Sequence, residues 1–276
     1  MENQARLAIT SQLHISFSQI FSYLSCSIKY QFRYVVCRQP ERISLALPFG
    51  SALHKSLERY YRSLPEGRKE KLDILQELFS EILTLELSDK KDQIVYNKDC
   101  PDADGAIAMG NAMLEAFYVN TDLEDHQIVA VELPMSASLY TDAGQPTEFK
   151  LVGFIDLLLK DPKGDYVVVD HKTAARAKTQ ADVDADLQMT VYSYLLSANR
   201  YVFPTAPVKC RFDVLRKLKT PKLEHYHSTR SADDRKRLAK IATCVLAGIE
   251  AGVFIPNRGW MYNDCEFSNA CANWHR

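Results

Sequence analysis

Val152-Gly153-Phe154-Ile155-Asp156-Leu157-Leu158 and Tyr166-Val167-Val168-Val169-Asp170-His171-Lys172 are two apolar runs that each carry an aspartate. The turn cluster Asp161-Pro162-Lys163-Gly164-Asp165 separates them, so both runs are predicted to be β-strands. A charged group within such a strand is costly unless it is paired or binds a metal. If the strands are neighbours, Asp156 lies beside Asp170, and their carboxylates need a cation. Hard oxygen ligands of this kind suit Mg²⁺ or Mn²⁺.

Lys172 adds a positive charge beside the acidic pair. Side chains alternate along a strand, so Asp170 and Lys172 point to one side and His171 to the other. Lys172 could activate an attacking water or stabilise negative charge that develops at phosphorus. The alternative is an ordinary salt bridge between Asp170 and Lys172, and the short D-x-K spacing alone favours that alternative.

Hydrophobic periodicity predicts helices, then strands, then strands and helices in alternation. The helices are expected from Ser16 to about Phe32 and over Pro48–Arg62, Asp73–Leu87, Ala103–Tyr118, Asp184–Asn199 and Asp233–Glu250. The strands are expected over Gln127–Tyr140, Phe149–Lys160, Tyr166–His171, Val208–Leu215 and Glu224–Ser228, the first three as an antiparallel meander. This order predicts an α/β fold with a mixed central sheet flanked by helices and a helical N-terminal extension.

We expect one domain over 1–276, mainly helical over 1–125, with an α/β core over 126–253 and a tail rich in cysteine and aromatic residues over 254–276. Of the 276 residues, 46% are hydrophobic and 25% charged, as in ordinary globular proteins. The net charge of -1 argues against nucleic-acid binding through bulk charge alone, although a local basic groove stays open. No export signal or long apolar run is visible, so we expect a cytoplasmic protein without a membrane segment.

Six motifs follow one another in a fixed order. They are Ser16-Phe17-Ser18 with Tyr23-Leu24-Ser25-Cys26, Phe49-Gly50-Ser51-Ala52-Leu53-His54, Val131-Glu132, Gly153-Phe154-Ile155-Asp156, Asp170-His171-Lys172-Thr173 and Gln188-Met189-Thr190-Val191-Tyr192. This set resembles the RecB-type branch of the PD-(D/E)XK nuclease superfamily, which includes CRISPR-associated exonucleases. The resemblance covers most of the chain and implies a restriction-endonuclease-like core.

The resemblance also implies roles for particular residues. His54, Asp156 and Asp170 would bind the divalent metal, together with the backbone carbonyl of His171, and Lys172 would orient or activate the water. Gln188 and Tyr192 are one helical turn apart and would help to place the substrate or Lys172.

For two residues of these motifs, the sequence also allows an ordinary structural role instead of a functional one. His54 alone could be a histidine of a helix core or surface. Glu132 could point inward toward the metal or Lys172, or it could be a solvated residue at a sheet edge.

Seven cysteines are present, and an intracellular chain keeps such residues as free thiols, metal ligands or redox groups. Some members of the branch carry a [4Fe–4S] cluster that joins the two ends of the chain. Cys26, Cys265 and Cys271 match three of its four cysteines, but Tyr262 stands near the fourth position, so Cys37 or a non-cysteine ligand would be needed. The alternative, slightly favoured, is an iron-free apolar plug formed by Trp260, Tyr262, Phe267 and Trp274.

Basic residues are dense between positions 209 and 240, and Lys29, Arg33 and Arg38 lie among tyrosines in the N-terminal helix. Such groups suit single-stranded DNA, whose bases stack on rings, but they could equally form solvated faces. The basic residues of the span are Lys209, Arg211, Arg216, Lys217, Lys219, Lys222, Arg230, Arg235, Lys236, Arg237 and Lys240.

These patterns predict a metal-dependent deoxyribonuclease, by resemblance an exonuclease acting on single strands or DNA ends. Its partners would be DNA and protein machinery such as a helicase or recombination or CRISPR components. One alternative is a DNA-binding or assembly subunit whose nuclease fold no longer cuts, but the full set of motif residues argues against it. Another alternative is a hydrolase of a different phosphate ester.

Overall fold

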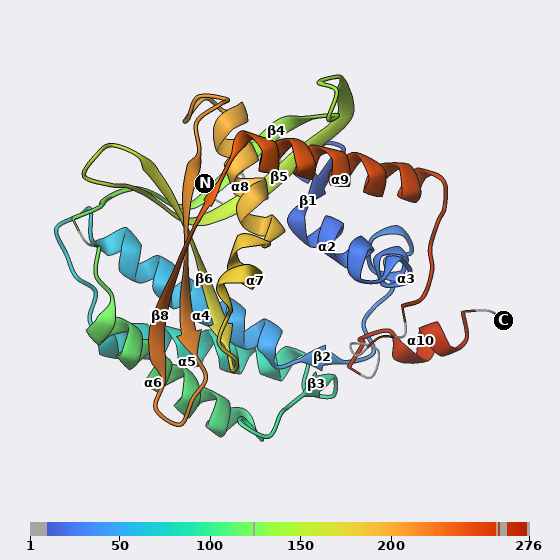
Figure 1. Ribbon diagram of the computed structural model, residues 1–276. Coiled ribbons are helices and arrows are strands. Elements are labelled where there is room, and N and C mark those ends of the chain that lie inside the picture. The colour runs from blue at the N-terminus through green and yellow to red at the C-terminus, as the bar shows by residue number, and fades with distance from the viewer. Residues whose placement is uncertain (1–9, 124, 258, 260–263, 275–276) are drawn as a thin grey trace.

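A six-stranded mixed sheet forms the centre of the molecule (Figure 1). The computed structural model describes residues 10–123, 125–257, 259 and 264–274. The strand order is β1-β5-β6-β7-β8, and β4 also pairs with β5. The strands are β1 His14–Ser16, β4 Gln127–Tyr140, β5 Pro146–Lys160, β6 Tyr166–Ala174, β7 Val208–Arg216 and β8 Lys222–Arg230.

The predicted meander is confirmed, because β4 and β6 both pair antiparallel with β5. β6 is longer than predicted and continues past His171, because its residues 167–174 run parallel to 209–216 of β7. The ladder between β5 and β6 is short, however. It covers only residues 157–160 of β5, and it ends just before Asp156 would face Asp170.

A gap in the sheet follows from this pairing. β4 occupies one edge of β5 along most of its length, so β1 and β6 must share the other edge. β1 pairs with residues 150–152 and β6 with residues 157–160. In the described part of the chain, therefore, no strand lies beside residues 153–156, which include Asp156, on that edge.

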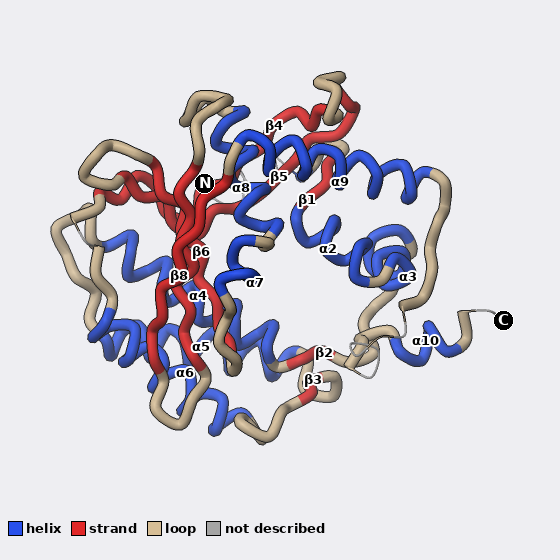
Figure 2. The backbone as a smooth tube through the Cα atoms, viewed as in Figure 1, coloured by secondary structure: helices blue, strands red, loops and turns tan. Residues whose placement is uncertain are grey.

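Helices cover both faces of the sheet (Figure 2). One face packs its apolar side chains against α4, α5 and α6, and the other packs against α8, α9 and the start of α2. No described helix is both long and apolar enough to cross a membrane. The helices are α2 Phe17–Ser25, α3 Ser27–Tyr30, η1 Gln31–Val35, α4 Ala46–Ser63, α5 Leu72–Asp89, α6 Ala103–Asn120, α7 Gln180–Asp184, α8 Leu187–Ala198, α9 Ala232–Glu250 and α10 Ser268–Ala272, and a small parallel pair is formed by β2 Ile43–Ser44 and β3 Ile94–Val95.

One predicted helix is broken in the structure. It is interrupted at Cys26, whose backbone is extended between α2 and α3. The helix predicted over 184–199 corresponds to α8, and the short helix α7 just before it was not predicted. Asp186 lies between them and caps α8, because its side chain accepts the N–H groups of Gln188 and Met189. Asp at this position satisfies backbone donors that a continuous helix would have bonded internally.

Gly153 lets α8 approach β5 closely. A β-carbon at this position would lie 2.8 Å from Leu195 Cδ1 and 3.4 Å from Tyr192 Cε1. Gly50 lies within α4, and a β-carbon there would meet nothing within 4 Å.

We therefore expect opposite effects from filling these two glycines. Gly153→Val should lower the free energy of unfolding by ~1–3 kcal/mol, because overpacking displaces α8. Gly50→Ala should leave it unchanged or raise it by up to ~1 kcal/mol, because alanine favours a helix interior. Urea denaturation measures the free energy of unfolding of both variants. Equal stability of the two variants would contradict the close packing of α8 on β5.

Candidate active site

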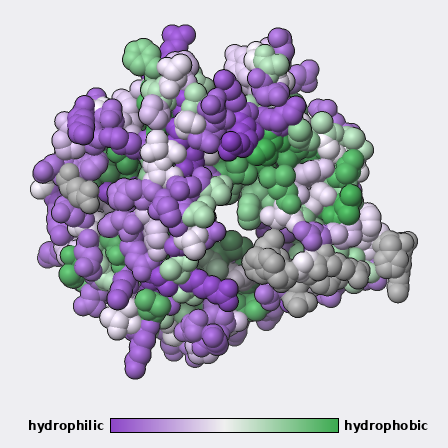
Figure 3. Space-filling view, viewed as in Figure 1, coloured by the Kyte–Doolittle hydropathy of each residue, from purple (hydrophilic) through white to green (hydrophobic). Residues whose placement is uncertain are grey.

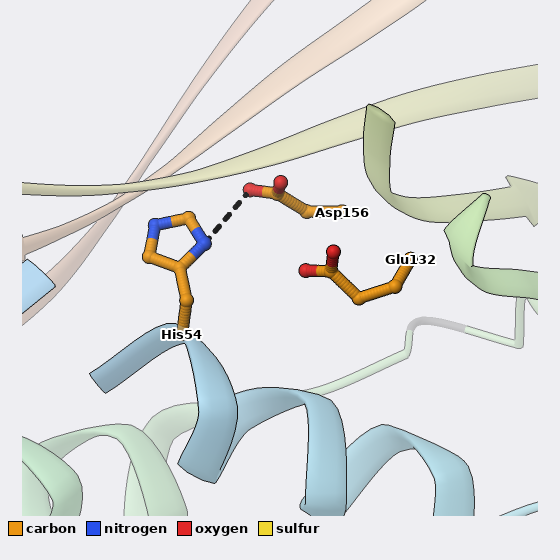
Figure 4. A group of neighbouring side chains, drawn as sticks. All are labelled: His54, Glu132 and Asp156. Carbon is orange, nitrogen blue, oxygen red and sulfur yellow. Dashed lines mark ion pairs between the residues drawn. The ribbon is translucent and has the colours of Figure 1, made fainter. Parts of the chain in front are cut away.

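Three side chains from three elements converge at the gap in the sheet (Figure 4). His54 comes from α4, Glu132 from β4 and Asp156 from β5, and one ligand atom of each lies within 4.8 Å of the others. His54 Nδ1 is 3.5 Å from Asp156 Oδ2. Glu132 faces inward and is only 8% exposed, so the solvated alternative for this residue is wrong.

Sheet register explains why Glu132 meets Asp156. The pairs on either side, Val131 with Leu157 and Leu133 with Ile155, put these two residues opposite each other on β4 and β5. Glu132 itself has a φ of 52°, in the left-handed region that non-glycine residues seldom adopt. Such backbone strain costs on the order of 1–3 kcal/mol. Strained residues are common at functional sites, where the surrounding structure fixes their conformation.

Asp156 is stabilised as a carboxylate. Its Oδ2 accepts a 2.8 Å hydrogen bond from the backbone N–H of His171. Burial alone would raise the pKa of Asp156, but a side-chain hydrogen bond with His171 and the charges of His54, His171 and Lys172 hold the pKa at about 2. Burial also lowers the pKa of His54, despite the Asp156 charge, and the neutral imidazole is the form that binds metals.

Asp170, Lys172 and Gln188 form a closed network beside this group. Lys172 Nζ lies 2.8 Å from Asp170 Oδ2 and donates to Gln188 Oε1 at 2.9 Å. Gln188 Nε2 in turn donates to Asp170 Oδ1 at 2.9 Å and to the Tyr192 hydroxyl at 2.7 Å. The shared helix face predicted for Gln188 and Tyr192 is thus used for one hydrogen-bonded unit, and the salt bridge between Asp170 and Lys172 is present within it.

The two aspartates differ in their electrostatics. Burial raises the pKa of Asp170 to about 7, with the Lys172 charge opposing the rise and the Asp156 charge adding to it. For Lys172, burial would lower the pKa, but the charges of Asp170 and Asp156 outweigh burial and raise it. The lysine is thus an ammonium ion that is one-third exposed, while Asp170 is fully buried.

The expected ligand set is assembled in part. His54 and Asp156 come together as predicted, and Glu132 completes a group of three. Asp170 lies outside this group, because Lys172 and Gln188 engage its oxygens. Ligation by Asp170 and by the His171 carbonyl stays a prediction.

The side chain of His171 lies on the face of β6 opposite to Asp170 and Lys172, with its Nδ1 3.7 Å from Asp156 Oδ2. Its ring packs against Tyr61 with centroids 5.3 Å apart, and its Nε2 is 4.0 Å from Asp213 Oδ2. Asp213 also binds His225 Nδ1 at 2.7 Å and Arg211 Nε at 2.8 Å. The sequence pattern did not predict that Asp213 and His225 lie beside His171. Register alone reveals it, because His171, Asp213 and His225 are partners across three strands.

The expected basic surface between positions 209 and 240 is much reduced. Arg211, Arg216, Arg230 and Arg235 are all less than 9% exposed. Lys209 is paired with Asp161 and Asp165. These groups bind backbone carbonyls and carboxylates of the protein itself, so they are largely unable to provide a field for phosphates. In the N-terminal helices, Lys29 and Arg33 both pair with Glu266.

The three predicted cluster cysteines do line one small cavity. Cys26, Cys265 and Cys271 surround a space of about 70 Å³ between the N-terminal helices and the tail. Among the described residues, however, these thiols do not form a group whose sulfur atoms all lie within 4.8 Å. Cys37 is exposed and does not line the cavity, and position 262 lies outside the described part of the chain. Four thiolate ligands are therefore not assembled among the described residues.

The predicted apolar plug is found in part. Phe267 is 1% exposed and packs on Phe32, with ring centroids 5.7 Å apart. Trp274 is 46% exposed and so is not part of a buried plug. Trp260 and Tyr262 lie outside the described residues. Glu41 also joins the two ends of the chain through a pair of hydrogen bonds, which we call the Glu41 clasp. Its carboxylate accepts the N–H groups of Asn269 and Ala270 at the start of α10.

The chain was compared with known proteins and structures. Its fold is similar to the crystal structure of a protein from Eubacterium rectale described as a candidate exonuclease, with 12% identity, a TM-score of 0.57, and coverage of 95% of this chain and 89% of that chain. The structure of SSO0001 shares 13% identity over 93% of each chain, but its TM-score of 0.32 supports no argument. No curated protein matches the sequence. The sequence pattern of the PD-(D/E)XK nuclease superfamily matches residues 14–272, from β1 to α10, and the chain therefore belongs to this superfamily.

Proposed function

We propose that the protein is a divalent-metal-dependent deoxyribonuclease that hydrolyses phosphodiester bonds in single-stranded DNA or at DNA ends. The observation that carries the proposal is the convergence of His54, Glu132 and Asp156 next to the network that holds Lys172. Family membership supports nuclease chemistry. The choice of DNA and of strand ends rests on the resemblance of the motifs.

The donor set fits a divalent cation. Two carboxylates and a neutral imidazole at a half-buried site suit Mg²⁺ or Mn²⁺, and without a cation the closely spaced carboxylates repel each other. When bound, such a cation supplies Lewis-acid stabilisation of charge on phosphoryl oxygens and favours ionisation of water.

The protein's own residues then have distinct tasks. Lys172 holds an ammonium group at the edge of the site, where it can donate to a phosphoryl oxygen or orient the attacking water. Gln188 fixes Lys172 and Asp170 relative to each other, and Tyr192 fixes Gln188 from the next helical turn. Asp186 and the packing of α8 on Gly153 keep this helix end in position.

The alternative is a non-cutting DNA-binding or assembly subunit. Loss of a motif residue, or a broken hydrogen bond in the Lys172 network, would favour it. Instead, every residue of the predicted set is present, Asp170, Lys172 and Gln188 bond to one another, and Tyr192 bonds to Gln188. The geometry therefore supports an active nuclease better than a non-cutting subunit.

Loss of either charge in the Asp170–Lys172 pair should abolish cleavage. We expect Asp170→Asn and Lys172→Ala each to reduce the rate by a factor of ~10²–10⁴, because an orienting or charge-stabilising group is lost. End-labelled single- and double-stranded oligonucleotides, incubated with Mn²⁺ or EDTA, measure this and also report end preference.

The exposed Lys163→Ala on the β5–β6 turn is the matched control and should cut at the wild-type rate. Wild-type cleavage rates in both active-site variants, with unchanged melting curves, would contradict the proposed roles of Asp170 and Lys172. Tight DNA binding without cleavage by the wild type would favour the non-cutting alternative.

Metal binding should depend on Glu132. At a Mn²⁺ concentration 100-fold above Kd, the cation should stabilise the wild-type protein by about 2.7 kcal/mol, seen as a rise in Tm. We expect Glu132→Gln to weaken Mn²⁺ binding by roughly tenfold or more, as loss of supporting groups does at other metal sites. The exposed Glu148→Gln on β5 is the control. The same Mn²⁺-induced rise in both variants would exclude Glu132 as a ligand.

At the chain ends, we propose packing without a [4Fe–4S] cluster. The Phe32–Phe267 contact, the Glu266 ion pairs and the Glu41 clasp already join the ends, and only three cysteines line the cavity. Protein purified without oxygen should therefore contain no stoichiometric iron and lack the visible absorption of a cluster. Cys265→Ser should leave Tm almost unchanged. A brown protein with four irons per chain would overturn this proposal.

A further inference from the structure

The pocket at the gap in the sheet has aromatic as well as catalytic walls. Its volume is about 330 Å³, and β5, α2, α4 and α8 contribute its lining. Phe154 and Phe17 line it together with Asp156 and Gln188. Phe154 lies two residues before Asp156 on β5, so the ring stands on the same strand segment as the metal-binding carboxylate.

The aromatic side chains continue from the pocket to the surface along α2. Phe17 is the first residue of α2, and its ring centroid lies 5.6 Å from that of Phe21, at an interplanar angle of 31°. Phe21 is 51% exposed. Figure 3 shows apolar surface gathered on the side of the molecule that carries α2 and α3, where Leu24, Val35 and Val36 are also exposed.

Rings in this position suit one chemical group of a nucleic acid. The phosphates would be met by the cation site and Lys172, and the sugar offers no flat apolar face. A nucleobase does, and base–aromatic stacking contributes substantially to the binding of unpaired strands. Four of the five arginines of the 209–240 span are buried, so these four cannot contact the phosphates of a bound strand.

We propose that Phe154 and Phe17 form a stacking wall for an unpaired nucleobase next to the scissile phosphodiester, so that this site acts on unpaired DNA. The inference rests on the proposed nuclease function and names the residues that would contact a base of its substrate. A base within a duplex has both faces covered by its neighbours and must leave the stack before it can lie on a ring. The pocket volume, at the lower end of the ~300–1,000 Å³ typical of small-molecule sites, suits a single nucleotide rather than a base pair.

The test compares an oligothymidylate with an abasic oligomer of equal length, which keeps the phosphates and removes every base. Phe154→Leu, which retains apolar volume without a π-face, should lower kcat/KM on oligothymidylate roughly 5- to 150-fold. On the abasic oligomer, wild type and variant should be equally slow. Phe154→Tyr should remain close to wild type, and Phe17→Leu should behave like Phe154→Leu.

Phe203→Leu is the matched control, because Phe203 is 81% exposed and does not line the pocket. Unchanged kcat/KM of Phe154→Leu on oligothymidylate, or an equal loss on both oligomers, overturns the stacking wall. Binding of both oligomers in EDTA, followed by fluorescence anisotropy, separates this proposal from the nuclease function. Weaker oligothymidylate binding by Phe154→Leu without any wild-type cleavage overturns the function and supports stacking.

Discussion

The hydrogen bond from the His171 N–H to Asp156 Oδ2 allows β5 and β6 to separate where the site is formed. A buried backbone donor needs a partner, and within a sheet the neighbouring strand normally supplies it. Here the ladder ends at Leu157 and Val169, and a side-chain carboxylate takes the place of the next ladder bond. The same contact orients Asp156 toward His54 and Glu132. Without it, the sheet would either close over the site or leave the His171 N–H unsatisfied.

Where β5 and β6 separate, the acidic and basic groups are divided between two adjacent units. Glu132 and Asp156 with His54 form the proposed cation-binding unit, and Asp170 forms an ion pair with Lys172. Gln188 is suited to join Lys172 and Asp170, because its amide donates to the carboxylate and accepts from the ammonium without adding charge. A charged residue in its place would favour one partner and repel the other.

The sequence predicted the strands, the mixed sheet and most of the site because those features depend on local patterns. Apolar runs with short turns fix β4, β5 and β6, and the helical spacing of Gln188 and Tyr192 fixes their shared face. Glu132 could not be assigned, because its inward direction depends on its pairing with β5 and on a left-handed backbone that no local pattern specifies. The short helix α7 was not predicted, because its five residues offer only two apolar side chains, too few for a helical period.

The buried arginines show most clearly what a count of charges misses. A basic stretch of sequence resembles a phosphate-binding surface, yet Arg230 donates to the carbonyl oxygens of Val183 and Asp186 and to Thr190 Oγ1. These bonds hold the α7–α8 junction, and hence Gln188, against the end of β8. Burying a guanidinium is costly unless its donors are satisfied, so this arginine is committed to the scaffold. In the proposed nuclease, its positive charge would therefore act indirectly, by fixing the helix whose Gln188 contacts Lys172, and recognition of the strand would be left to the groups in the pocket.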